Sequence, residues 1–131
     1  MKYYISKKIS TDFDQAVLLV TESLKKEGFG VLTEINLQEK LKEKLNVDFR
    51  KYKILGACNP AYAYKAIQQE DKIGTMLPCS VIVQELENNK IEVAAVDPVA
   101  SMMAIENPDL AEIAGEIKEK LERACIIVSR I

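Results

Sequence analysis

The residues of this sequence that are most able to do chemistry are two cysteines and an aspartate that stand next to prolines. Cys58 precedes Asn59-Pro60, Cys79 follows Pro78, and Asp97 precedes another proline. A thiolate can act as a nucleophile or bind a soft metal, and a carboxylate can accept a proton or a cation. The chain has no histidine, which excludes a Ser-His-Asp triad, a histidine general base and a histidine metal site within one chain.

Three kinds of function are compatible with these residues. In the first, loops at the strand ends form a pocket for a small ligand or a partner, without turnover. In the second, Cys58 is a nucleophile or sulfur carrier and Cys79 is the resolving thiol, in disulfide exchange or persulfide transfer. In the third, both thiolates and Asp97 hold a soft metal, with further ligands from a dimer mate or solvent.

Each of these residues also has a purely structural interpretation. A free cysteine is often a small buried hydrophobe, which is what we expect of Cys125 inside its apolar run. Asp97 and Asn59 each precede a proline and can cap a helix. The cysteines form no Cys-x-x-Cys pair, and Cys58 and Cys79, the only metal candidates, are 21 positions apart, a poor match for structural zinc. No cofactor is predicted, and catalysis stays an open question.

The composition indicates an ordinary globular chain. Its 131 residues suit one domain, 1–131, with 48% apolar and 29% charged residues. Lysine and arginine total 18 and the acidic residues total 20, so no basic excess favours nucleic acid or an anionic membrane as a partner. Apolar runs are too short for a membrane span or a secretory signal peptide. We therefore expect a cytoplasmic protein with free thiols.

The hydrophobic pattern predicts elements in the order βαβαβαββαα. The predicted strands cover 2–9, 30–35, 52–57, 80–87 and 90–96, and helices follow Asp12, Asn36, Asn59, Asp97 and Asn107. Three helices carry an apolar stripe: Phe13, Ala16, Val17, Val20 and Leu24; Leu37, Leu41 and Leu45; and Leu110, Ile113, Ala114, Ile117 and Leu121. These features predict an α+β fold with a mixed or largely antiparallel sheet of about five strands and helices packed on it.

A hairpin brings the candidate residues toward one end of this sheet. With Asn88-Asn89 as a two-residue turn, Cys79 faces Pro98 and lies beside Asp97. One objection is that the same register opposes two glutamates, Glu85 and Glu92. If the strand at 52–57 runs antiparallel to the next strand, Cys58 joins the same end, near a helix N-terminus that favours its thiolate.

The sequence also resembles the "domain of unknown function 302" family of small bacterial and archaeal proteins. The resemblance covers nearly the whole chain. It is carried by residues 28–35, 47–52, 54–60, Gly74, Leu77-Pro78-Cys79 and residues 94–98. It implies a compact α+β domain that forms a homodimer, and it implies no particular activity.

Our interpretation from sequence is therefore a small-ligand or partner-binding module. Its expected site lies at the strand ends, and the candidate residues are Cys58, Asn59, Pro60, Pro78, Cys79 and Asp97. A thiol-based enzyme and a soft-metal protein, both using Cys58 and Cys79, are the alternatives.

Overall fold

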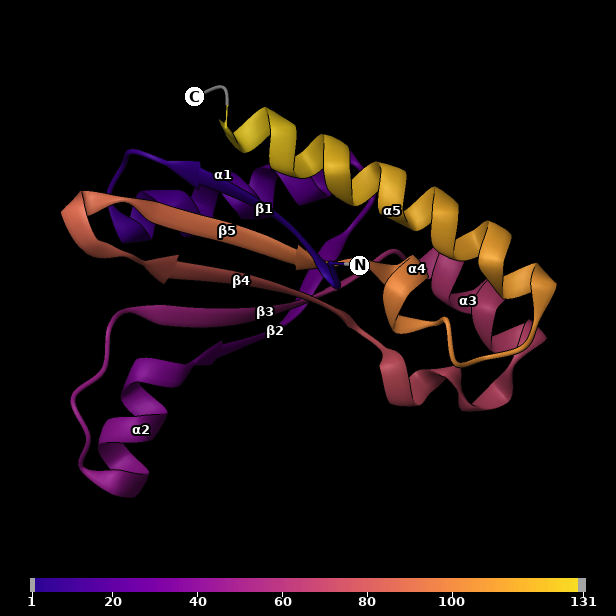
Figure 1. Ribbon diagram of the computed structural model, residues 1–131, viewed down its shortest axis with the longest axis horizontal. Helices are drawn as coiled ribbons and strands as arrows, with labels where there is room; N and C mark the ends of the chain where they lie inside the picture. Colours follow the sequence, from indigo (N-terminus) through magenta and orange to yellow (C-terminus); the bar gives the residue numbers. More distant parts are fainter. Residues whose placement is uncertain (1, 130–131) are drawn as a thin grey trace.

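A computed structural model describes residues 2–129 and contains one five-stranded sheet (Figure 1). The strand order is β1-β5-β4-β3-β2, and every neighbouring pair is antiparallel. The strands are β1 (Tyr4–Ile9), β2 (Gly30–Asn36), β3 (Tyr52–Cys58), β4 (Cys79–Glu85) and β5 (Ile91–Val96). The predicted α+β class is confirmed, and the sheet is antiparallel throughout.

The two edges of the sheet are β1 and β2. The β1 edge carries two consecutive lysines, Lys7 and Lys8. The β2 edge is interrupted by a register shift between Val31 and Thr33, where it pairs with β3. Neither edge strand is therefore a regular, uninterrupted apolar strand.

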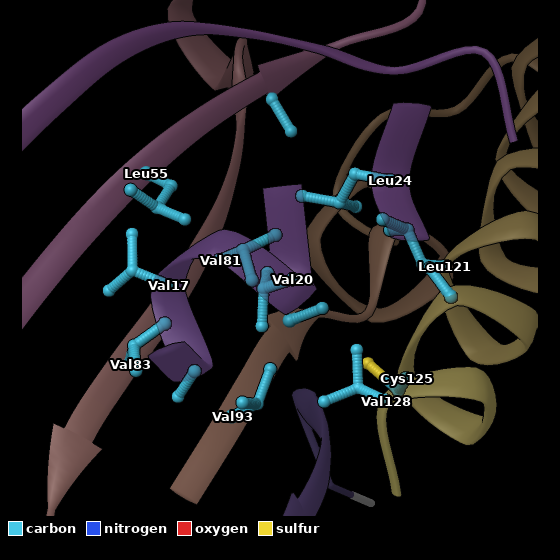
Figure 2. Packing of buried hydrophobic residues seen from close by; sticks show 14 of the residues in the cluster. Val17, Val20, Leu24, Leu55, Val81, Val83, Val93, Leu121, Cys125 and Val128 are labelled. Carbon is cyan, nitrogen blue, oxygen red and sulfur yellow. The ribbon is translucent and has the colours of Figure 1, made fainter. Parts of the chain in front are cut away.

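Two of the five helices in the described chain cover one face of the sheet and enclose the main core. The helices are α1 (Phe13–Lys26), α2 (Leu37–Leu45), α3 (Pro60–Gln69), α4 (Pro98–Ser101) and α5 (Pro108–Ser129), with 3₁₀ turns at Asp71–Met76 and Glu87–Asn89. Figure 2 shows Val20 and Leu24 of α1 and Leu121, Cys125 and Val128 of α5 meeting the valines of β4 and β5. A smaller cluster lies between α3, α4 and the start of α5: Ala66, Ile73, Met102, Leu110 and Ala114.

The helix boundaries follow the capping residues that the sequence predicts. The Asp12 carboxylate accepts a hydrogen bond from the backbone N–H of Gln15 at 2.8 Å, and Asn36 accepts one from Glu39 at 3.1 Å. All five stripe residues of α1 are buried. Burial of Cys125, with 4% of its surface exposed, confirms its expected place in the core. No helix within residues 2–129 is both long and apolar enough to cross a bilayer.

The β4–β5 hairpin has a different register from the predicted one. Residues 87–89 form a three-residue turn in which Asn88 and Asn89 have φ of 62° and 58°, and Leu86 N–H donates to the Lys90 carbonyl at 2.7 Å. Val81 pairs with Ala95, one position from the expected register, so this expectation was wrong. In the observed register Glu85 and Glu92 are no longer opposite each other, because Glu92 pairs with Gln84 and Glu85 pairs with Ile91. The objection to the predicted hairpin is thereby removed.

The second face of the sheet is not covered by α1 or α5. We call it the open face. It consists of alternate strand residues: Tyr4, Ser6, Lys8, Thr33, Ile35, Tyr52, Ile54, Gly56, Ser80, Ile82, Gln84, Glu92, Ala94 and Val96. Helix α2 lies outside the sheet, next to β2 and β3 and on the side away from α5 (Figure 1). It is at the end of the sheet where the β4–β5 turn lies. None of its residues is buried.

Candidate functional site

The two candidate cysteines lie at the same end of the sheet. Strands β3 and β4 are antiparallel, as the prediction requires, and Cys79 pairs with Ala57. Strand alternation, however, places Cys79 on the helix-covered face and Cys58 on the other face, where it pairs with Gly30 of β2. The thiols are thus neighbours on adjacent strands whose side chains leave opposite faces of the sheet.

The two thiols differ in burial. Cys79 is a member of the main core with 5% of its surface exposed, whereas Cys58 is only partly buried. Burial raises the pKa of the Cys79 thiol to about 11, and the neighbouring Cys58 adds a smaller upward contribution. Burial likewise raises the pKa of Cys125 to about 11. Cys79 and Cys125 are therefore protonated at neutral pH, which is typical of packed cysteines.

The difference in burial predicts selective labelling of the native protein. At pH 8 a thiol of pKa about 11 is ionised in about one molecule per thousand, so iodoacetamide should modify Cys58 alone. Intact-mass spectrometry should show one adduct in the native protein and three after denaturation in urea. Native labelling of Cys79 at the same rate as Cys58 would contradict the burial of Cys79.

Asn59 and its proline start α3, but the asparagine does not cap the helix. Its side chain makes no capping hydrogen bond with α3. Instead Asn59 Nδ2 donates to the backbone carbonyl of Glu27 at 3.3 Å and lies against Gly28, whose φ is +88°. A β-carbon on Gly28 would come within 2.9 Å of that amide nitrogen. Asn59 therefore fastens the start of α3 to the end of α1.

Pro78 packs against a residue that the sequence analysis did not select. A β-carbon on Gly56 would lie 2.8 Å from Pro78 Cγ and still closer to Thr33 Oγ1. Gly56 is therefore the position that allows β2, β3 and the segment before β4 to meet closely. Its place in a predicted strand was the signal for a close approach, because glycine within a strand often marks one.

Asp97 has structural partners on two helices. One carboxylate oxygen accepts hydrogen bonds from the N–H groups of Val99 at 2.9 Å and Ala100 at 3.3 Å, which caps α4. The other oxygen forms an ion pair with Lys118 Nζ of α5 at 3.1 Å. Only 7% of Asp97 is exposed. Within residues 2–129, no hydrogen bond or ion pair joins it to either thiol.

The candidate residues therefore lie at one end of the sheet, but their polar contacts do not join Asp97 to the thiols. The thiols lie by β3 and β4, whereas Asp97 connects β5, α4 and α5 and borders a surface cavity of about 410 Å³ with Tyr4, Ser6 and Lys118. Among the described residues, no group of three or more cysteine, aspartate or glutamate side chains could hold a metal.

The open face carries a groove that the sequence analysis did not identify. Its volume is about 460 Å³, and its lining includes Tyr4, Tyr52, Ile82, Glu92 and Ala94. The lining combines apolar side chains in the middle of the sheet with aromatic rings at its rim, which is the usual character of a binding surface. The predicted hairpin register opposed Ile82 to Ala95, whereas in the structure Ile82 is opposite Ala94, so the sequence analysis did not group these residues on one face.

The family comparison and the structural comparison identify the same family. The family model described as "Domain of unknown function DUF302" matches residues 5–127. A crystal structure of an uncharacterized conserved DUF302 protein from Bacillus stearothermophilus is similar, with 31% identity and a TM-score of 0.90 over 97% of this chain and 98% of that chain. No curated protein matches the chain. The chain belongs to the family of domains of unknown function 302.

Proposed function

We propose that this domain is a partner-binding module whose binding surface is the open face, and that the partner is a second copy of the chain. The observation that carries the proposal is the apolar character of that face. An antiparallel sheet with one face in water usually alternates apolar and polar residues. Here the open-face positions in the middle of the sheet are Ile54 and Ile82, which are partly buried, and Ala94, which is 8% exposed. Such a surface is typical of a protein interface.

The size of the open face supports association of two copies. Five strands about 4.8 Å apart and six residues long, at about 3.3 Å per residue, give a face of about 24 by 20 Å. Helix α2, about 14 Å long and about 10 Å wide, lies beside this face. Together they offer on the order of 600 Å² of flat projected area, and accessible area exceeds projected area. A standard interface buries about 800 Å² per partner.

An Ile82→Glu variant tests the proposal. Wild-type protein should sediment as a dimer at micromolar concentration, and Ile82→Glu should sediment as a monomer because each copy would bury an unpaired carboxylate in the interface. We expect the dissociation constant to rise by at least about a hundredfold. Leu18→Glu is the matched control, since Leu18 is 61% exposed on α1, which covers the other face.

Two further measurements keep this test decisive. Circular dichroism should show that Ile82→Glu is folded, and Ile35→Glu, at a position 44% exposed on the β2 edge, should weaken the dimer with less effect on folding. A monomeric wild-type protein, or a dimer that survives both substitutions, would overturn the proposal.

A further inference from the structure

The segment between β2 and β3 forms an arm whose apolar stripe lacks a covering surface. We define the arm as residues 37–51, which contain α2. Its predicted stripe is only partly covered at Leu37 and Leu41, while Leu45 is 65% exposed and Val47 is 44% exposed. An amphipathic helix with an uncovered apolar side at its tip is suited to packing against another molecule.

The arm and the rest of the molecule carry opposite net charge. The arm has five basic and three acidic residues, whereas the rest of the chain has thirteen basic and seventeen acidic residues. Lys40 pairs with Glu43 at 3.7 Å and Lys42 pairs with Asp48 at 3.0 Å. Lys44 at the tip forms no ion pair within the described residues. The arm therefore presents apolar side chains together with an unpaired cation.

The open-face groove has features that complement the arm, namely an apolar middle and a carboxylate at one end. Its middle is apolar, and at one end lies Glu92, which is partly buried. Gln84 Nε2 donates a hydrogen bond to Glu92 Oε1 at 2.7 Å. The amide oxygen of the same glutamine, Oε1, accepts one from Arg50 Nε at 2.8 Å. Lys8 is opposite Glu92 in the β1–β5 ladder. Neither Lys8 nor Arg50 forms an ion pair with Glu92 in the described chain, so its carboxylate has no cation in direct contact.

A simple symmetry brings these two surfaces together. Suppose that two open faces pack against each other about a twofold axis parallel to the strands. This operation lays β2 of one copy over β1 of the other and keeps the strand ends level. The arm leaves β2 after Asn36 and enters β3 at Tyr52, and Tyr52 is level with Gln84 and Glu92. The arm of one copy then reaches the end of the second sheet that contains Glu92.

We propose that the arm of each copy lies across the open face of its partner, with Leu45 and Val47 over the groove and Lys44 facing Glu92 of the partner subunit. This inference rests on the proposed self-association and specifies its contacts. Packed sheets are about 10 Å apart, and α2 is about 14 Å long, so the arm is long enough to cross between the two copies. The groove is filled by the partner's arm in the dimer.

Charge reversal on each side of this contact provides the test. Lys44→Glu alone and Glu92→Lys alone each place like charges at both contacts of a homodimer, which should weaken it at least about tenfold. An equimolar mixture restores attraction at both contacts, since wild-type Lys44 meets wild-type Glu92 and the two reversed residues meet each other. Sedimentation should show heterodimers of nearly wild-type affinity, and the preference should vanish in molar salt.

The control and the opposing outcomes separate this inference from the proposed function. Lys26→Glu makes the same charge change on α1 and should leave the dimer intact. If Ile82→Glu gives monomers but mixing the two charge variants restores nothing, the arm contact is wrong and the open-face dimer stands. If the wild-type dimer binds an apolar dye such as ANS in the groove, and Ile82→Glu abolishes this binding, the groove holds a small apolar ligand and the arm contact is overturned.

Discussion

Replacing Asp97 with alanine is expected to destabilise the domain by about 3 kcal/mol. The substitution removes the acceptor for two N–H groups of α4 and also the counter-ion of Lys118 on α5. Loss of a cap alone costs about 1 kcal/mol. Loss of the ion pair adds to this, but less than a fully buried pair would, because the Lys118 side chain is 36% exposed and can reach water. Urea unfolding monitored by circular dichroism measures the change.

Asp97→Asn separates the two contributions. Asparagine is as good a helix cap as aspartate, so this variant keeps the α4 hydrogen bonds and loses only the charge that faces Lys118. We expect a loss of about 1–2 kcal/mol for Asp97→Asn. Equal losses for alanine and asparagine would show that the cap contributes nothing. An unchanged stability in Asp97→Ala would contradict the structural role of this carboxylate.

Gly56→Ala is expected to destabilise the domain by about 2 kcal/mol, the usual effect of overpacking. The added methyl group would meet Thr33 Oγ1 and would come within 2.8 Å of Pro78 Cγ. Gly56 is buried in β3 and pairs with both Thr33 and Ser80, so the strand cannot move away without breaking its ladders. Thermal unfolding should show a decrease of several degrees.

The double variant Gly56→Ala/Thr33→Ala identifies which neighbour causes the strain. Removing the threonine hydroxyl relieves one of the two contacts and leaves the proline ring in place. We expect the double variant to recover about half of the lost stability, with Thr33→Ala alone as its control. No recovery would assign the strain to Pro78, and a harmless Gly56→Ala would mean that the three segments are less closely packed than described.

The sequence was sufficient to predict both the position and the packing of those helices whose apolar residues pack against their own chain. The stripe of α1 is buried as predicted, and in α5 four of the five stripe residues are buried while Ile113 is partly buried, because periodicity identifies the apolar side of a helix. The same reasoning applied to α2 located the helix correctly but not its surroundings. Periodicity shows that Leu45 belongs to an apolar side; it does not show that this chain leaves the side uncovered.

Prediction of the candidate site was limited by local geometry. Topology correctly placed Cys58 and Cys79 at one end of the sheet, but strand alternation directs them to opposite faces. The hairpin register was wrong by one residue because Glu87 joins the two asparagines in the turn. Asn59, which looks like a helix cap, is used instead to hold the carbonyl of Glu27. Such choices depend on neighbours that are distant in the sequence.

The edges of the sheet limit how large any assembly of this protein can become. A free, regular strand edge recruits further strands and can propagate into fibrils. Here one edge bears Lys7 and Lys8, whose charges repel an identical strand, and the other is bent by the irregularity between Val31 and Thr33. Lateral growth of the sheet from molecule to molecule is therefore disfavoured, and at high concentration the protein should stay free of amyloid.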